Sequence, residues 1–417
     1  MPQGKLFPRL ASALTLNRIR AHGLVLVICM WSLYVADVST PGLRDRFGLI
    51  KGTDFVHFYT LGSLALQHHG AELYDAQAQT AMAEKLVPEA QGLHYVALYG
   101  PQVSLFFAPF ARLSYGWALA LWWLVSSALY GVCCYLIWRL CANLQSYGFV
   151  VLLLAMAYPA FLHLIAWGQT SAPGLLCVTA AFLALRSGRR LLAGVAIGFL
   201  AFKPSLGLAA AFVFVFACEW KVVAGAIASG AIQLAAAWLY YGTSVMRSYI
   251  NALRHVPDMF PYLEPRPYAV HSLRAFWALL VPWPWPAFVL YVLTSAVTLV
   301  IALRLWKSGA PLSLRYSALL TATVLVSPHL TVYDLVVVAP AFLLLSDWTV
   351  AHPQHSGSPL LGVLLYLSYA LPLFGFLSQW THLQLSVVAF AGLLWCLWHI
   401  AVAPESGEAA GSLKLAC

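Results

Sequence analysis

The sequence predicts an all-α membrane protein that crosses the bilayer many times. Of its 417 residues, 62% are hydrophobic and only 9% are charged, whereas about a quarter of the residues of a globular domain are charged. Apolar runs of about 20 residues, enough to cross a hydrocarbon core of ~30 Å, recur along most of the chain. Lysine and arginine are densest in the short connections between these runs. These three observations together predict a polytopic helical bundle.

The first apolar run, residues 23–41, follows a basic amino-terminal segment, residues 1–22. This arrangement resembles a signal peptide, but Tyr34 and Asp37 stand where small cleavage-site residues are expected. We therefore expect a first helix that is retained in the membrane, with residues 1–22 in the cytoplasm.

The remaining runs predict one transmembrane domain over residues 23–403, followed by a cytoplasmic tail at 404–417. Counting every run long enough to cross, the sequence predicts roughly 12 transmembrane helices. The spans after the first are 102–138 (a re-entrant or interfacial piece, then a helix from about Trp117), 147–166, 171–186, 191–202, 204–218, 222–241, 285–304, 314–328, 331–346, 358–377 and 383–402.

The formal charge of +9 is explained by topology and not by a nucleic-acid partner. Basic residues mark short cytoplasmic connections, so their distribution places the amino terminus inside. Two long loops, about 42–101 and 242–284, then lie outside and are expected to carry short interfacial helices. Acidic residues gather in these loops: Asp45, Asp54, Glu72, Asp75, Glu84, Glu89, Asp258 and Glu264. Function is therefore sought on the outer face.

The sequence contains no motif typical of a metal site or of redox chemistry. The eight cysteines lie mostly in apolar runs, with no zinc-type or CxxC spacing, and we interpret them as packing residues. No DxD-type carboxylate pair is present to hold a divalent ion. We expect no metal and no cofactor.

Polar residues interrupt several apolar segments, where they are costly and mark candidate functional positions. Lys203 precedes a proline in FLAFKPSLG, His329 and Asp334 lie in SPHLTVYD, and Gln169 lies in IAWGQTSAP. With Asp54 of KGTDFVHFYT, they are predicted to reach one level of the membrane. The alternatives are a snorkelling lysine at a helix end and a transporter, since broken helices recur at transporter binding sites.

Five ordered stretches resemble glycosyltransferase family 87, over about residues 50–345. They are TDF with FYTLGSLALQHHGAELYD, LYGPQVSLFFAPFARLSYGWALALWW, WGQTS, RSGRRLLAGVAIGFLAFKPSLGL and SPHLTVYDLVVVAPAFLLL. The resemblance implies a GT-C-type bundle in the bacterial inner membrane, with the active site facing outward. It also implies transfer of a hexose, mannose first, from a polyprenyl-phosphate sugar to a lipid or glycan acceptor among membrane lipids.

The resemblance also implies roles for individual residues. Asp54 matches the family's general base in the first external loop, which takes the proton from the acceptor hydroxyl in an inverting transfer. The departing phosphate needs cations or hydrogen-bond donors, which Lys203 and His329 match, with Arg274 and Arg266 from the second loop as further candidates.

Sugar and acceptor contacts are expected from aromatic and polar residues on the same surface. These candidates are His57, Tyr59, Tyr99, Gln169 and Asp334. His57 lies three positions after Asp54 and would share its face on a helix.

The sequence departs from the family pattern at two places on the outer face. Trp167 stands where many members have asparagine, and Gly100 stands where Tyr-Pro-Pro is common. A lipid transporter or flippase and a non-catalytic family member remain the alternatives to a transferase. The absence of an evident inverted repeat counts against the transporter.

Overall fold

The structure is a computed structural model that describes residues 12–256 and 266–402. Among these residues helices dominate, and extended pairing is limited to two isolated bridges, Arg44 with Ile50 and Val270 with Thr331. Asp258, Glu264, the first eleven residues and the predicted tail at 404–417 lie outside the described residues. The prediction of an all-α multi-pass membrane protein is confirmed.

Six helical segments in the described ranges are long and apolar enough to cross a membrane. They are α2 (Leu16–Val38), α6 (Tyr115–Trp138), α12 (Trp220–Tyr241), α16 (Pro284–Lys307), η9 (Val332–Val338) with α18 (Ala339–Ala351), and α19 (Ser358–Ala370) with η10 (Leu371–Leu377) and α20 (Ser378–Thr381).

A seventh span is possible if a bent pair of segments counts as one, with a 45° change of direction between them. It joins η5 (Ala142–Tyr147) and α7 (Gly148–Met156) to α8 (Pro159–Trp167). Five shorter apolar segments complete the bundle, and whether each of them crosses the membrane decides the total, so the count of roughly 12 stays a prediction. These are α9 (Ser171–Arg186), α10 (Arg190–Gly198) with η6 (Phe199–Phe202), η7 (Pro204–Gly207) with α11 (Leu208–Phe216), α17 (Leu312–Val326) and α21 (Leu385–Val402).

The first span has other boundaries than the predicted residues 23–41. The helix begins at Leu16, where the Thr15 side chain caps it by accepting from the backbone N–H of Arg18, and it ends at Val38. Arginines can stand in the first turns because their long side chains carry the charge away from the apolar region. The apolar run alone therefore marks the wrong start for this helix.

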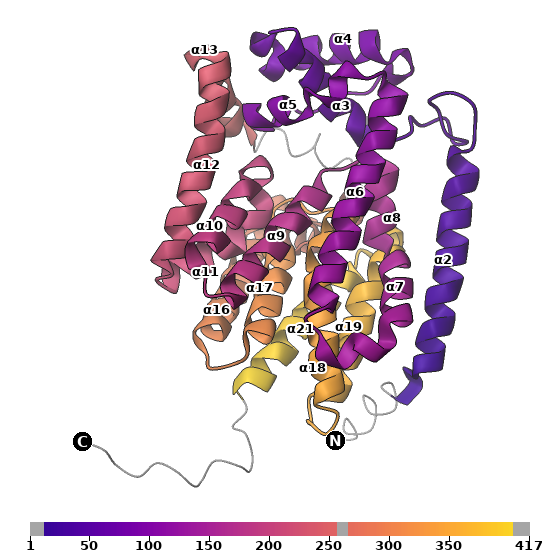
Figure 1. Ribbon diagram of the computed structural model, residues 1–417, viewed down its shortest axis with the longest axis vertical. Helices are drawn as coiled ribbons and strands as arrows, with labels where there is room; N and C mark the ends of the chain where they lie inside the picture. The colour runs from indigo at the N-terminus through magenta and orange to yellow at the C-terminus, as the bar shows by residue number, and fades with distance from the viewer. Residues whose placement is uncertain (1–11, 257–265, 403–417) are drawn as a thin grey trace.

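Short helices from the two long loops, together with the segment 101–112 that follows the first loop, gather at one end of the molecule (Figure 1). We call this layer the cap. It comprises α3 (Thr53–Leu66), η2 (Gly70–Tyr74), α4 (Ala76–Leu86), η3 (Pro88–Ala90), α5 (Pro101–Phe107), η4 (Phe110–Arg112) and α13 (Thr243–Arg254).

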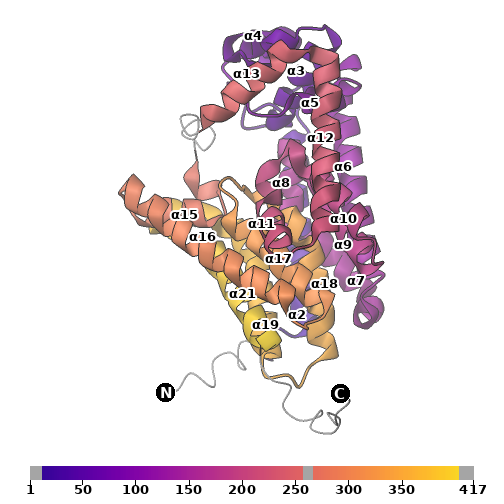
Figure 2. The same ribbon diagram turned by 90° about the vertical axis from the view of Figure 1, so that its left-hand side faces the viewer.

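The cap joins segments that are far apart in sequence, because α13 packs against η2. The start of α2 and the end of α21 lie at the opposite end of the bundle (Figures 1 and 2). The rest of the second loop contains η8 (Pro267–Ala269) and α15 (Leu273–Leu280). Short helices in both long loops agree with the sequence prediction.

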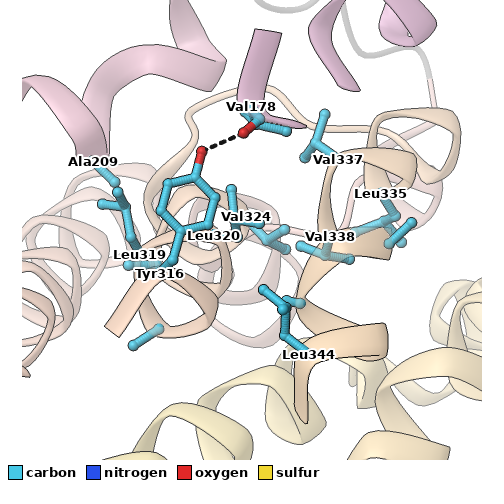
Figure 3. Packing of buried hydrophobic residues seen from close by; sticks show 14 of the residues in the cluster. Val178, Ala209, Tyr316, Leu319, Leu320, Val324, Leu335, Val337, Val338 and Leu344 are labelled. Carbon is cyan, nitrogen blue, oxygen red and sulfur yellow. Dashed lines mark hydrogen bonds between the residues drawn. The ribbon is translucent and has the colours of Figure 1, made fainter. Parts of the chain in front are cut away.

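The centre of the bundle is built around α17, which is buried over most of its length. Tyr316 on this helix is fully buried, and its hydroxyl donates to the backbone carbonyl of Val178 on α9 at 2.6 Å (Figure 3). Leu320 and Val338 pack beside it from α17 and η9 (Figure 3). The hydroxyl thus has a partner in a region with no water to replace it.

Glycines let α10 and α12 pack backbone against backbone. A Cβ atom on Gly194 would lie 2.0 Å from the carbonyl oxygen of Val222, and one on Gly225 would lie 2.2 Å from that of Leu191. Between apolar helices in lipid, such small residues allow the close approach that van der Waals packing requires. This contact fixes the helix that leads into Lys203.

Candidate functional site

Breaks in four separate segments place polar side chains together beneath the cap. Asp54 lies in the first turn of α3, and Gln169 lies in the turn between α8 and α9. Lys203 occupies the break between η6 and η7, while His329 and Asp334 lie between α17 and the first turn of η9. The charges of Lys203, His329 and Asp334 each act on the ionisation of Asp54, so the predicted convergence is observed.

Asp54 is held by a neutral amide. The Nε2 group of Gln169 donates to Oδ2 of Asp54 at 2.7 Å, and the Oε1 atom of Gln169 accepts from the backbone N–H of Thr170 at 3.2 Å. Gln169 is buried, whereas Asp54 is only half-buried. Gln169, predicted to contact sugar or acceptor, thus has its amide committed to Asp54 and to its own turn.

Two left-handed glycines allow these turns to meet. Gly52, which precedes α3, has φ of 66°, and Gly168, which ends α8, has φ of 68°. A Cβ on Gly168 would lie 2.7 Å from the Cβ of Phe55. The Tyr115 hydroxyl donates to the carbonyl of Gly52 and the Trp122 indole to that of Gly168, both at 3.0 Å. Only glycine accepts both this backbone conformation and this contact.

Lys203 and Asp334 form a buried ion pair. The Lys203 ammonium lies 2.5 Å from Oδ1 of Asp334, and the side chains are 8% and 0% exposed. The Ser171 hydroxyl donates to the same oxygen at 2.5 Å, and Oδ2 of Asp334 accepts from Thr331 in a capping box. Pro204 ends the preceding helical segment and so sets the ammonium at the break.

The surroundings shift the ionisation of Asp54 and His329 in opposite directions. Burial raises the pKa of Asp54 from its ordinary 3.8 to about 6, although the Gln169 hydrogen bond, the charge of Lys203 and, when it is protonated, His329 lower it. Asp334 adds a further rise. Burial lowers the pKa of His329 to about 4. At neutral pH the site therefore contains an ionised Asp54 and an uncharged imidazole.

His57 of α3 and Tyr99 are neighbours, whereas the hydroxyl of Tyr59 is committed to the cap. The His57 ring is buried, 4.9 Å from the ring of Tyr95 and 5.7 Å from that of Tyr99, and its pKa falls to about 4 through burial. Neither ring nitrogen has a hydrogen-bond partner among the described residues. Tyr59 packs in the cap, where its hydroxyl donates to the carbonyl of Leu113 at 2.7 Å.

The two arginines predicted for the second loop occupy different surroundings. Arg274 is half-buried on α15, and its Nε atom donates to the carbonyl of Pro328 at 2.5 Å. Its charge acts on His329, which places it at the edge of the cluster. Arg266 is exposed before η8, and among the described residues it makes no hydrogen bond or ion pair with the cluster.

An apolar cavity of about 570 Å³ adjoins the site. Its lining includes Thr170, next to Gln169, and Gln102 of α5. The body is lined from α5, α9, α10, η6 and α12 by Val103, Phe106, Phe107, Pro173, Leu176, Cys177, Ala180, Leu192, Val195, Ala196, Phe199, Phe202 and Gln233. A Cβ on Gly100, just before α5, would lie 2.4 Å from the side-chain oxygen of Gln102, so the glycine lets the Gln102 amide pack there.

Sequence reasoning did not identify this cavity, although a signal for it exists. The residues lining it from α9 and α10 recur at helical spacing and mix small with large side chains. Such a stripe is typical both of packing against a neighbour and of a groove, so the cavity becomes visible only with the helices in place.

No metal centre is found in the described part of the chain. Within residues 12–256 and 266–402, no group of three or more His, Cys, Asp or Glu side chains is arranged to hold a metal ion. That the reaction needs no metal or cofactor remains a prediction.

Comparison with known proteins gives one family match. The model of glycosyltransferase family 87 matches residues 97–328, more than half of the chain. The matched segment includes Gln169, Lys203 and Arg274, while Asp54 and Asp334 lie outside it. No curated protein and no solved structure matches the chain.

Proposed function

The chain belongs to glycosyltransferase family 87, and from this premise we propose that it transfers a hexose, mannose first among the candidates, from a polyprenyl-phosphate sugar. The acceptor is a lipid- or glycan-linked hydroxyl on the outer face of a bacterial inner membrane. The density of lysine and arginine in the short connections supports this orientation.

The observation that carries the proposal is the state of Asp54. Its carboxylate is half-buried and bonded to the neutral amide of Gln169, with no ion pair in the described part of the chain. A pKa of about 6 makes it a stronger base than an ordinary aspartate, yet leaves it ionised at neutral pH. A general base works best when its pKa lies near the operating pH.

Asp54 would act on the acceptor in a single inverting displacement. The acceptor hydroxyl gives its proton to Asp54 while its oxygen forms a bond to the anomeric carbon. The bond from that carbon to the phosphate oxygen breaks on the opposite face, and the lipid phosphate leaves with the electron pair. Protonation of Asp54 removes one negative charge from the protein as the phosphate gains one.

Lys203, His329 and Arg274 are suited to the leaving phosphate. Lys203 and the uncharged His329 can donate hydrogen bonds, and Arg274 brings a guanidinium close to His329. Because Lys203 is paired with Asp334, it contributes a strong local dipole more than a net charge. Arg274 and Arg266 of the second loop are further candidates for contacts to the phosphate.

The apolar cavity supports a lipid-linked donor. Thr170, beside the Gln169–Asp54 contact, lines it together with apolar side chains of α9 and α10. A hydrocarbon chain there would keep its phosphate and sugar near Thr170, next to the base. His57 and Tyr99, whose rings lie 5.7 Å apart, are candidates for acceptor contacts, as aromatic and imidazole rings suit a sugar.

The test is transfer by Asp54→Asn. Purified enzyme is incubated with polyprenyl-phosphate mannose, glucose or arabinose and a lipid extract of the host. We expect wild type to transfer at least one sugar and Asp54→Asn to lose about 10²–10⁴-fold in rate, the usual contribution of a general base. Asp75→Asn is the matched control, because asparagine caps α4 as well as the aspartate that caps it now.

Three results of this assay are informative. A wild-type transfer rate in Asp54→Asn would show that Asp54 is not the general base. Absence of transfer from all three donors by wild type would favour a non-catalytic family member. Loss of activity in Asp75→Asn as well would point to damage of the cap and not to lost proton transfer.

A further inference from the structure

The two oxygens of Asp54 are not equivalent. Oδ2 accepts a hydrogen bond from Gln169 at 2.7 Å, whereas Oδ1 has no hydrogen-bond partner among the residues that the structure describes. The side chain remains half-buried, so the carboxylate is not sealed from the space around it. One oxygen is thus engaged with the protein, and the other keeps its lone pairs for a further donor.

The direction of the Gln169 amide is fixed by its own turn. Its Oε1 atom accepts from the Thr170 N–H at 3.2 Å, which assigns oxygen to that end of the amide and the NH₂ group to the Asp54 end. Its backbone N–H donates to the carbonyl of Leu164 at 3.2 Å, and the residue is only 6% exposed. Gln169 can therefore neither flip its amide nor turn away without losing buried hydrogen bonds.

We propose that Gln169 is a positioning residue that holds Asp54 by Oδ2, so that Oδ1 is the oxygen that receives the proton of the acceptor hydroxyl. This inference rests on the proposed function. As the proton passes to Oδ1, the acceptor oxygen bonds to the anomeric carbon, and the lipid phosphate leaves with the electrons of the broken bond. Gln169 keeps its own protons throughout and stays bonded to Oδ2.

The same contact favours the ionised form of the base. An N–H donor stabilises a carboxylate more than a carboxylic acid, so the Gln169 hydrogen bond lowers the pKa of Asp54 against the larger effect of burial. Without the amide, the pKa of Asp54 rises further. The other titratable groups that face Asp54 stay in place in such a variant: Tyr95, Tyr99, Tyr115, Lys203, His329, Tyr333 and Asp334.

The experiment compares wild type with Gln169→Leu in two pH titrations. Infrared difference spectra follow the protonated carboxyl band of Asp54, which is identified by its loss in Asp54→Asn. Initial rates with polyprenyl-phosphate mannose, glucose and arabinose give the pH dependence of kcat/KM. We expect Gln169→Leu to move both midpoints to higher pH and to lower kcat by about tenfold, the effect of a misplaced base.

Gln79→Leu is the matched control. Gln79 is a buried glutamine of the cap, on α4, whose Nε2 donates to the carbonyl of Leu73 at 2.6 Å and not to Asp54. We expect this variant to leave both midpoints unchanged, even if the protein is less stable. If Gln169→Leu does not fold, Gln169→Glu keeps the side-chain length and should move the midpoints upward more, because it places a second carboxylate beside Asp54.

The infrared midpoint decides the inference without any sugar donor. An Asp54 midpoint that is the same in wild type, Gln169→Leu and Gln169→Glu would overturn the positioning role. A shifted midpoint in a protein that transfers no sugar would support the hold of Gln169 on Asp54 and contradict the proposed function instead. Equal pH profiles with only a lower rate would indicate a purely structural glutamine, and would also overturn the inference.

Discussion

Asp54 and Asp334 belong to the same cluster, but their surroundings differ. Asp334 is fully buried and bonded to Lys203 and Ser171, each at 2.5 Å. Asp54 is half-buried and bonded to the uncharged amide of Gln169. The charge of the Asp334 carboxylate is thus balanced by an ammonium group, whereas the Asp54 carboxylate has no ion-pair partner among the described residues. Such a contrast is how a site separates a structural carboxylate from a reactive one.

The largest effect on stability is expected from breaking the Lys203–Asp334 pair. Asp334→Asn keeps the shape of the side chain but leaves the Lys203 ammonium buried without its counter-charge. We expect a loss of about 3–5 kcal/mol in the free energy of unfolding. Unfolding titrated with SDS in one detergent measures it, and the double variant Lys203→Met with Asp334→Asn should recover most of the loss.

The Arg190–Glu219 pair is the control for this experiment. Its atoms lie 3.1 Å apart, but the arginine side chain is 59% exposed. Arg190→Met should cost no more than about 1 kcal/mol, because solvent screens the pair. Equal losses for the two pairs, or a double variant at the Lys203–Asp334 pair that is no more stable than Asp334→Asn, would contradict a buried, mutually dependent pair.

A smaller effect is expected from separating Asp54 from Gln169 through the backbone. Gly168→Ala forces alanine into a left-handed backbone conformation, which is strained. It also places a Cβ 2.7 Å from that of Phe55, so the α8–α9 turn must move away from α3. Gly188→Ala is matched, since Gly188 has φ of 71° and nothing within 4 Å of its Cβ position. The alanine at 168 should cost about 1–3 kcal/mol more than the one at 188.

Activity sharpens the same comparison. Gly168→Ala should lower the rate of sugar transfer, because it displaces Gln169 from Asp54. Gly188→Ala should keep the wild-type rate. Unfolding titrations and transfer rates on both proteins check this prediction. If the two alanine variants behave alike, the close contact between the turns is not what holds Asp54 in place.

The smallest effect concerns the lipid chain, which should depend on the cavity beside Asp54 and not on the outer surface of the bundle. Ala196→Trp fills the cavity from α10 and should raise the KM for the polyprenyl-phosphate donor by at least about tenfold, or ~1.4 kcal/mol. Ile227→Trp is the control on α12, where the side chain is 66% exposed. Rate measurements over donor concentration test it, and equal KM values in both variants would place the chain elsewhere.

Much of the architecture could be predicted from the sequence. Composition and apolar runs gave the all-α multi-pass class, and the interruptions at Asp54, Gln169, Lys203, His329 and Asp334 gave the convergent cluster. These features are local, because a costly polar residue in an apolar run is visible without knowing its neighbours. The start of α2 was predicted wrongly, because its first turns carry arginines outside the apolar run.

The partners within the cluster could not be predicted. Gln169 and Asp54 are 115 positions apart, and Lys203 and Asp334 are 131 apart. The pairing of these side chains depends on how closely the turns that carry them approach one another. Glycine contacts and helix breaks determine that approach. Tyr59 shows the same limit, since only the packing of α3 directs its hydroxyl to Leu113.

The pH dependence of kcat/KM in wild type tests the central claim most directly. Burial raises the pKa of Asp54 to about 6, and the base acts only when ionised. The rate with the accepted polyprenyl-phosphate sugar should therefore fall about tenfold per pH unit below a midpoint near 6, and this limb should be lost in the residual activity of Asp54→Asn. A rate that stays constant down to about pH 4.5 would contradict Asp54 as a base with a raised pKa.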